Sequence, residues 1–277
     1  MNQLYKNIGI SKQAIAQNEV RQSHFDAQLI QLMNEVEELR REHPGCGLEK
    51  IYFSLNPSFL GRDKFIELFT SLGFRLAKKL NYKRTTYSSP SNYPNLIKGM
   101  EVKAPSIIWQ TDITYFEVGD RFYYGVFIID VYTKIIVGYQ VSDNMRATAN
   151  IKTLKAAIKN YTAPKIHHSD RGSQYTCNDY IGLLKEYKCK ISMAQSAQDN
   201  AYAERINNTI KNEYLIYWKQ TTFEQLKIQV NKAVYQYNNS RIHNNLRRET
   251  PVGFYNNWMS NKQYRNITMN IYNNDNN

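Results

Sequence analysis

The order of hydrophobic patterns between residues 107 and 240 constrains the fold of this chain more than any other feature. Three segments rich in β-branched and aromatic residues follow one another across short turns, at 107–118, 122–132 and 135–141. They predict three strands in an antiparallel meander. The later segments predict a helix at 144–161, a strand at 165–170, a helix at 179–187, a strand at 190–194, and helices at 199–217 and 222–240. This order, βββαβαβαα, predicts an α/β fold with a mixed sheet and helices on both of its faces.

The region before this pattern predicts a small all-α domain. Apolar residues recur at helical spacing in three segments, which begin at Phe25, Leu48 and Phe65. Pro44 ends the first of them. Three short helices with tight turns have the size of a helix-turn-helix domain, for which we expect the bounds 25–87.

The remaining segments carry weaker signals. Residues 1–24 are polar and predict either a leader or part of a further helix-turn-helix. Residues 88–106 are rich in Ser, Pro and Asn, which is typical of a linker. This linker precedes the α/β domain, which we expect at 107–262, and residues 263–277 predict a polar tail.

The balance of charge favours a polyanionic partner. The chain has 36 Lys and Arg against 24 Asp and Glu, and its net charge is +12. Nucleic acid and anionic membranes commonly accept such charge, and the alternative is a charge that serves solubility alone. No stretch approaches about 18 consecutive apolar residues, so the sequence predicts no membrane partner. Nucleic acid is therefore the favoured partner.

The cysteines and the N-terminus bear on the cellular compartment. The chain has an odd number of cysteines and no Cys-x-x-Cys pair: they are Cys46, Cys177 and Cys189. This argues against a disulfide framework and against a cysteine zinc site. The N-terminus has no apolar core of the signal-peptide type. Both observations agree with a reducing compartment, and we expect a cytoplasmic protein.

A basic stretch overlaps the end of the predicted helical domain. Residues 75–100 contain no acid, and they include Lys78, Lys79, Lys83 and Arg84. Such a run is commonly just a solvated face. After a helix-turn-helix it is also typical of a strip that lies along DNA phosphates, which is the interpretation we favour.

Three carboxylates occupy positions at which the predicted fold would bring them together. Asp112 lies inside the first strand, where a carboxylate is costly unless something compensates it. Asp170 ends the fourth strand, where α/β sheets open toward a ligand. Glu204 lies in the first turns of a helix, after the capping residues Asp199 and Asn200. Each acid alone has an ordinary structural alternative, and their joint occurrence in this order favours a common site.

Such a site has a defined chemistry. Three carboxylates at one point could not all stay ionised without a cation. Oxygen-only ligands suit Mg²⁺ or Mn²⁺ better than zinc. Two such ions can activate an attacking oxygen and stabilise a leaving oxygen, which is the chemistry of phosphodiester cleavage and transfer. The attacking oxygen would be that of water in cleavage and that of a DNA 3′-hydroxyl in joining.

Several sequence motifs, between about residue 25 and residue 260, resemble one enzyme family. They are Trp109–Tyr115, His168–Thr176, Ser192–Ala194, Asp199–Ala201 with Glu204, and Tyr237-Asn238 with Arg241, His243, Leu246 and Pro251. The chain resembles DDE transposases, the catalytic proteins encoded by the second reading frame of two-frame bacterial insertion sequences. It is more distantly similar to retroviral integrases. The resemblance implies a ribonuclease H-like integrase core and metal ligation by the three carboxylates.

The resemblance also implies roles for further residues. Lys211 is seven residues after Glu204, on the same helix face, and would touch substrate DNA, with a solvated lysine as the alternative. His168 and Asn200 would support the ligands, although a packed core histidine is an equal alternative for His168. Arg241 would either contact DNA phosphate or shape the end of the core.

The implied partners are double-stranded DNA, further copies of the chain, and the upstream-frame protein of the same element. The DNA would be both transposon ends and target. One departure from the family concerns the segment between Asp170 and Glu204, which has 33 residues, fewer than is usual, and whose loop 195–198 lacks the usual glycine.

Two other functions are compatible with the predicted fold. A DNA-binding regulator could keep the fold without chemistry, but the retention of all three carboxylates and Lys211 favours an active enzyme. A ribonuclease H-type nuclease would hydrolyse without joining, but the separate basic helix-turn-helix domain favours an enzyme of specific DNA ends.

Overall fold

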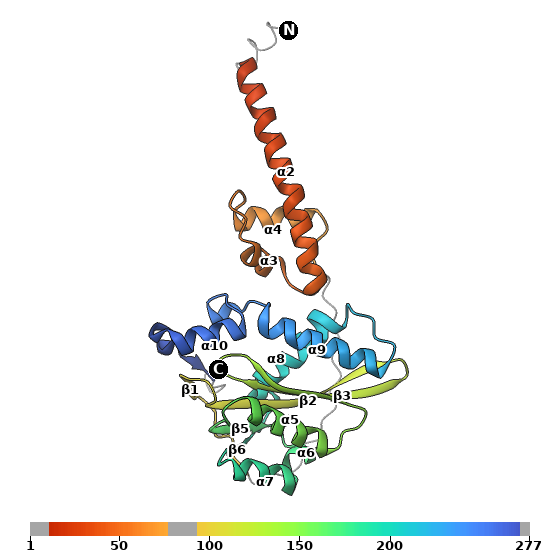
Figure 1. The fold of residues 1–277 in the computed structure, drawn as a ribbon, viewed down its shortest axis with the longest axis vertical. Coiled ribbons are helices and arrows are strands. Elements are labelled where there is room, and N and C mark those ends of the chain that lie inside the picture. Colours follow the sequence, from red (N-terminus) through yellow and green to blue (C-terminus); the bar gives the residue numbers. More distant parts are fainter. Residues whose placement is uncertain (1–10, 77–92, 272–277) are drawn as a thin grey trace. The chain divides into compact units, whose positions relative to one another are not determined.

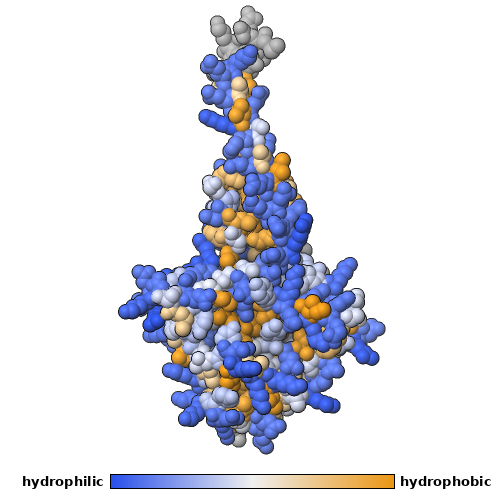
Figure 2. All heavy atoms as spheres, viewed as in Figure 1, coloured by the Kyte–Doolittle hydropathy of each residue, from blue (hydrophilic) through white to orange (hydrophobic). Residues whose placement is uncertain are grey.

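The computed structural model describes residues 11–76 and 93–271. The chain divides into two compact units, residues 1–76 and residues 77–277 (Figure 1). Among the helices of the described ranges, none is both long enough and apolar enough to cross a membrane. On the face drawn in Figure 2, hydrophilic side chains predominate around smaller apolar patches.

Within residues 11–76 the first unit consists of three helices around one apolar core. They are α2 (Lys12–Glu42), α3 (Leu48–Leu55) and α4 (Arg62–Ser71). All three helices contribute buried apolar side chains, and the rings of Phe65 and Phe69 stack with their centres 4.3 Å apart. The three helices predicted from the periodicity are therefore present.

The first helix begins earlier than the periodicity predicts. The hydroxyl of Ser11 accepts a hydrogen bond from the N–H of Ala14 at 3.0 Å, and the helix starts at Lys12. No Gly or Pro interrupts its 31 residues, so it runs through a stretch whose side chains are mostly exposed. Residues 12–24 therefore belong to α2, which differs from the predicted boundary at residue 25.

The second unit is built on a mixed sheet of five strands. They are β2 (Ile108–Val118), β3 (Arg121–Asp130), β4 (Ile136–Ser142), β5 (Ile166–Ser169) and β6 (Lys190–Met193). Their spatial order is β4-β3-β2-β5-β6; the first three pair antiparallel, whereas β5 and β6 run parallel to β2. Gly119 in the β2–β3 turn has a φ of +60°, which glycine adopts without steric cost. The predicted meander and the two parallel strands are confirmed.

Helices cover both faces of this sheet (Figure 1). One face packs under α5 (Ala147–Asn160), α6 (Ser173–Thr176) and α7 (Asn178–Glu186). The other face packs under α8 (Ala201–Thr209), the π-helical segment η2 (Ile210–Leu215) and α9 (Phe223–Asn239). The strand order and the helices on both faces are those of the predicted ribonuclease H-like fold.

Parts of the predicted linker and tail are folded into this unit. β1 (Glu101–Val102) pairs antiparallel with β7 (Met269–Asn270). Val102 and Met269 are buried in one core with Phe254 of α10 (Pro251–Ser260). Around α10 lie two short 3₁₀ segments, η3 (Asn244–Leu246) and η4 (Lys262–Asn266). The bounds 107–262 are therefore too narrow, because isolated apolar residues in both flanking segments pack against one another.

Candidate active site

Asp112 lies within β2, and Asp170 directly follows the end of the neighbouring strand β5. β2 and β5 are parallel, and Gln110 of β2 is paired with His168 of β5. Asp112 and Asp170 each follow two residues later, so their side chains leave the sheet on one face at adjacent positions. The pairing of β2 with β5 thus places the two aspartates next to each other.

Both aspartates are held by hydrogen-bond donors. Oδ1 of Asp112 accepts from the backbone N–H of Ile113 at 2.9 Å, and Oδ2 accepts from Nδ2 of Asn207 at 2.9 Å. Oδ1 of Asp170 accepts from the N–H of Gly172 at 2.9 Å. A β-carbon at residue 172 would lie 3.0 Å from that oxygen, so the glycine lets the backbone approach the carboxylate. These bonds restrict the orientation of both carboxylates.

The start of α8 is docked on β2 by amide groups. Oε1 of Gln110 accepts from the N–H of Tyr202 at 3.1 Å. The carbonyl of Thr111 accepts from Nδ2 of Asn200 at 2.9 Å, and Asn200 is buried, which agrees with its predicted supporting role. These bonds fix the helix against the strand that carries the first aspartate.

Glu204 occupies the face of α8 that these contacts turn toward β2. It follows Asn200 by four residues and precedes Asn207 by three, a spacing that places all three on one side of a helix. Asn207 bonds directly to Asp112. Glu204 is half-buried, and its charge acts on the Asp112 carboxyl.

The charges of Asp170 and Glu204 act on the Asp112 carboxyl. Burial raises the pKa of Asp112 to about 8, and the charges of Asp170 and Glu204 add to the effect of burial. Burial also raises the pKa of Asp170 and the pKa of Glu204. Carboxylates that repel one another in a desolvated site are stabilised by a cation. The electrostatics therefore favour a positively charged ligand.

The short loop before α8 is closed by a side chain. Oδ2 of Asp199 accepts from the N–H groups of Gln195 at 2.8 Å and Ser196 at 2.9 Å. Residues Ala197–Asn200 form a 3₁₀ turn, η1, that leads directly into α8. The loop without the usual glycine thus leads into the helix that carries Glu204.

Lys211 lies beside the carboxylates. It belongs to η2, where the helix widens from α to π geometry. Its ammonium lies 4.9 Å from the centre of the Tyr115 ring. Burial lowers the pKa of Lys211, and the charge of Asp112 opposes this effect. The side chain is half-buried near Asp112, which disfavours the alternative of a freely solvated lysine.

His168 is part of the packing between strands. It is fully buried, and its Nδ1 shares a hydrogen bond of 2.8 Å with Oγ of Ser192 on β6. Burial lowers the pKa of His168 to about 4, so the ring is neutral at pH 7. These contacts favour the alternative of a packed core histidine.

Arg241 forms an internal ion pair. Its Nε and Nη2 donate to the two carboxylate oxygens of Glu213 at 2.7 and 2.8 Å, and Arg241 is only 8% exposed. Glu213 lies in η2, so the pair ties the end of α9 to the segment that carries Lys211. Of its two predicted roles, the structure favours shaping the core over contact with phosphate.

The other predicted DNA contacts, Lys78, Lys79, Lys83 and Arg84, lie outside the described residues. Conversely, the sequence interpretation omitted Asn207, whose amide bonds to Asp112. The position of Asn207, three residues after Glu204, was a signal that helical spacing could have supplied.

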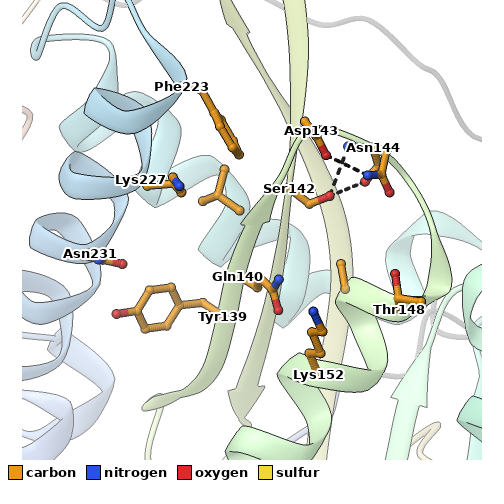
Figure 3. A pocket seen from close by; sticks show the side chains of 12 residues that line it. Tyr139, Gln140, Ser142, Asp143, Asn144, Thr148, Lys152, Phe223, Lys227 and Asn231 are labelled. Atoms are coloured by element: carbon orange, nitrogen blue, oxygen red, sulfur yellow. Dashed lines mark hydrogen bonds between the residues drawn. The ribbon is translucent and has the colours of Figure 1, made fainter.

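A groove with a volume of about 690 Å³ lies elsewhere, along the free edge of β4 (Figure 3). Tyr139 and Phe223 lie on its α9 side, and Gln140 and Lys152 on its α5 side. It contains none of the three carboxylates. β4 is two strands away from β2, a separation of about 10 Å. The groove is therefore not the site of the predicted chemistry.

Two domain families with the same description match much of the second unit. The integrase core domain family matches residues 102–198, and a second family of the same description matches residues 185–251. The matches include all three candidate carboxylates. The catalytic core of human T-cell lymphotropic virus type 2 integrase aligns with a TM-score of 0.45 and 20% identity, over 55% of this chain and 97% of that one.

Relatives are found among insertion sequences. The "Insertion element IS600 uncharacterized 31 kDa protein" of Shigella sonnei is 31% identical over 207 residues, or 72% of this chain and 76% of that protein. The "Transposase for insertion sequence element IS904" of Lactococcus lactis is 30% identical over 187 residues, or 64% of this chain and 74% of that protein. The chain spans between 51% and 76% of the length of such relatives. It belongs to the family of insertion-sequence transposases that carry an integrase core domain.

Proposed function

We propose that this transposase cleaves and joins DNA strands at a divalent-metal centre held by Asp112, Asp170 and Glu204. The observation that carries the proposal is that the buried Asp112 carboxyl lies close enough to Asp170 and Glu204 to feel their charges: burial raises the pKa of Asp112 to about 8, and the two neighbouring acids add to the rise. An enzyme that only bound DNA would gain nothing from carboxylates clustered in a desolvated site, since they repel both one another and phosphate.

The donor set fits Mg²⁺ or Mn²⁺, two ions being the usual number for this chemistry. All three side chains offer oxygen, the donor that these cations prefer. Oδ1 of Asn207 is one of several buried polar atoms without a hydrogen-bond partner among the described residues, and a water beside a bound ion would satisfy it. Within the described ranges, the structure contains no group of three or more His, Cys, Asp or Glu side chains arranged to hold a metal ion. We therefore expect Glu204 to complete the site when cation and DNA bind.

Bound ions would supply charge stabilisation to the attacking and leaving oxygens. The residues of the chain position the reactants. Asp112 and Asp170 face one edge of the sheet, and Lys211 presents an ammonium beside them that would bind a phosphate of the substrate. The aromatic ring of Tyr115 limits the freedom of that ammonium. Water would be the nucleophile in cleavage and a DNA 3′-hydroxyl in joining.

The first unit and the basic stretch after it would bind the ends of the element. A three-helix unit of this size is typical of sequence-specific DNA binding, and the net charge of +12 favours a polyanion. We further propose that at least two copies act together, because two DNA ends must be brought to one target. The upstream-frame protein of the same element is a candidate partner, and the substrate places the activity in the bacterial cytoplasm.

Incubation of the protein with a labelled terminal-repeat duplex and Mg²⁺ or Mn²⁺ tests the proposal. Asp170→Asn should abolish cleavage and joining, whereas Asp120→Asn, an exposed acid of the β2–β3 turn, should leave both intact. Equal products from wild type and Asp170→Asn would refute the site. Binding of the ends without any metal-dependent product would favour a silent DNA-binding regulator, and cleavage of RNA in a hybrid would favour a nuclease.

A further inference from the structure

Among the described residues, Asn207 makes the only side-chain hydrogen bond between α8 and a carboxylate of the proposed active site. Its Nδ2 donates to Oδ2 of Asp112 at 2.9 Å, and its side chain is on the helix face of Glu204. The residue is 5% exposed, so this bond is not exchanged freely with solvent water.

The bond limits how the Asp112 carboxylate can turn. The backbone N–H of Ile113 donates to Oδ1, while Asn207 donates to Oδ2, so each oxygen of Asp112 has a separate donor. A carboxylate oxygen has two lone pairs, and one donor on each leaves the remaining lone pair directed to a fixed place. Without Asn207, rotation of the carboxylate would be restrained at Oδ1 only.

The other end of the same amide has no partner. Oδ1 of Asn207 is buried and accepts no hydrogen bond from the described residues. A buried acceptor without a donor costs free energy, so a bound water that donates to Oδ1 would stabilise it. Since Oδ1 and Nδ2 are bonded to the same carbon, this acceptor lies close to the Asp112 carboxylate.

We propose that Asn207 is a positioning residue of the metal centre, which orients Asp112 through Nδ2 and offers Oδ1 to a water held beside the bound ion. The proposal rests on the proposed function, since it assumes that Asp112 binds a cation. Partners of metal-binding side chains typically change metal affinity by about 10- to 100-fold when removed. A merely structural amide between α8 and β2 would alter stability without altering that affinity.

Binding of Mn²⁺ to the full chain, followed by the electron paramagnetic resonance signal of free Mn²⁺, measures the effect directly. Asn207→Ala should weaken Mn²⁺ binding about 10-fold or more. Asn208→Ala, which removes an exposed amide from the next position of α8, should bind Mn²⁺ as the wild type does. Asn207→His keeps an N–H at the same number of bonds from Cα but has no acceptor in place of Oδ1, so it should regain part of the affinity.

The outcomes separate this proposal from the function on which it rests. If wild type and Asp170→Asn bind Mn²⁺ equally, the metal site itself is wrong. If Asp170→Asn loses binding but Asn207→Ala retains wild-type affinity, Asn207 has no positioning role. Thermal unfolding is measured for each variant; should Asn207→Ala be unfolded at the assay temperature, Asn207→His is judged alone, and wild-type affinity in that variant would overturn the role of Oδ1.

Discussion

Replacing Asp112 by Asn should stabilise the metal-free protein, and increasingly so as the pH rises. Burial, helped by the charges of Asp170 and Glu204, raises the pKa of Asp112 to about 8, against about 3.9 in an unfolded chain. Between these two values the folded protein retains a proton that the unfolded chain has released. The unfolding free energy of the wild type therefore falls as the pH rises from about 4 to about 8 and changes no further above that.

The magnitude follows from the two pKa values. Each unit of difference corresponds to about 1.4 kcal/mol, so the limiting penalty is about 5 kcal/mol at pH 8 and about 1.5 kcal/mol at pH 5. Asparagine is neutral at every pH, and its Oδ1 can still accept from Ile113. The Nδ2 of the introduced side chain is a donor, so the Asn207 amide would have to rotate and accept through its Oδ1. One hydrogen bond between the two side chains would then replace the present one. Because a folded site relaxes around a charge, we expect about half the limit, 2–3 kcal/mol at pH 8.

Urea unfolding in the presence of EDTA, at pH 5 and at pH 8, measures this difference. All three tryptophans, Trp109, Trp218 and Trp258, belong to the second unit, so their fluorescence reports on that unit alone. Asp120→Asn, in the exposed β2–β3 turn, is the control and should change the unfolding free energy by the same small amount at pH 5 and at pH 8. A variant of Asp112 that is no more stable than the wild type at pH 8, or whose advantage is the same at pH 5, would refute the reasoning.

Three further predictions concern other contacts of the same unit. Lys211→Ala should lower strand transfer by about 10-fold or more while the melting temperature hardly changes, and Lys211→Arg should retain more activity; equal loss in both would argue against phosphate binding. Arg241→Ala should lower the unfolding free energy by about 3 kcal/mol in urea titrations, because it removes the bidentate ion pair with the half-buried carboxylate of Glu213, and much less in a Glu213→Gln background. Gly138→Ala should cost about 1–3 kcal/mol by the same titration, since a β-carbon there would lie 2.9 Å from Cβ of Ala157; an unchanged midpoint would mean that α5 moves freely.

Local pattern was sufficient for much of the fold and for naming the three candidate acids. The β-branched segments, the helical periodicities and the turn residues predicted the order of strands and helices along the chain, because the signals of each element lie within about ten residues. Asp112 and Asp170 could be paired in advance, since parallel strands that lie next to each other bring their carboxyl ends to one edge. The seven-residue spacing placed Lys211 on the helix face of Glu204, while its proposed DNA contact came from the family resemblance; in the structure Lys211 belongs to the π-helical segment η2.

What remained undecided depends on contacts between distant parts of the chain. Val102 and Met269 look like isolated apolar residues in polar segments, and only the pairing of β1 with β7 shows that they share a core. The sequence around Arg241 is compatible with a phosphate partner and with an internal carboxylate, and the structure shows the ion pair with Glu213. Asn207 became a functional candidate only when its amide was found against Asp112. Periodicity determines which face of an element a residue occupies, but tertiary packing determines what that face meets.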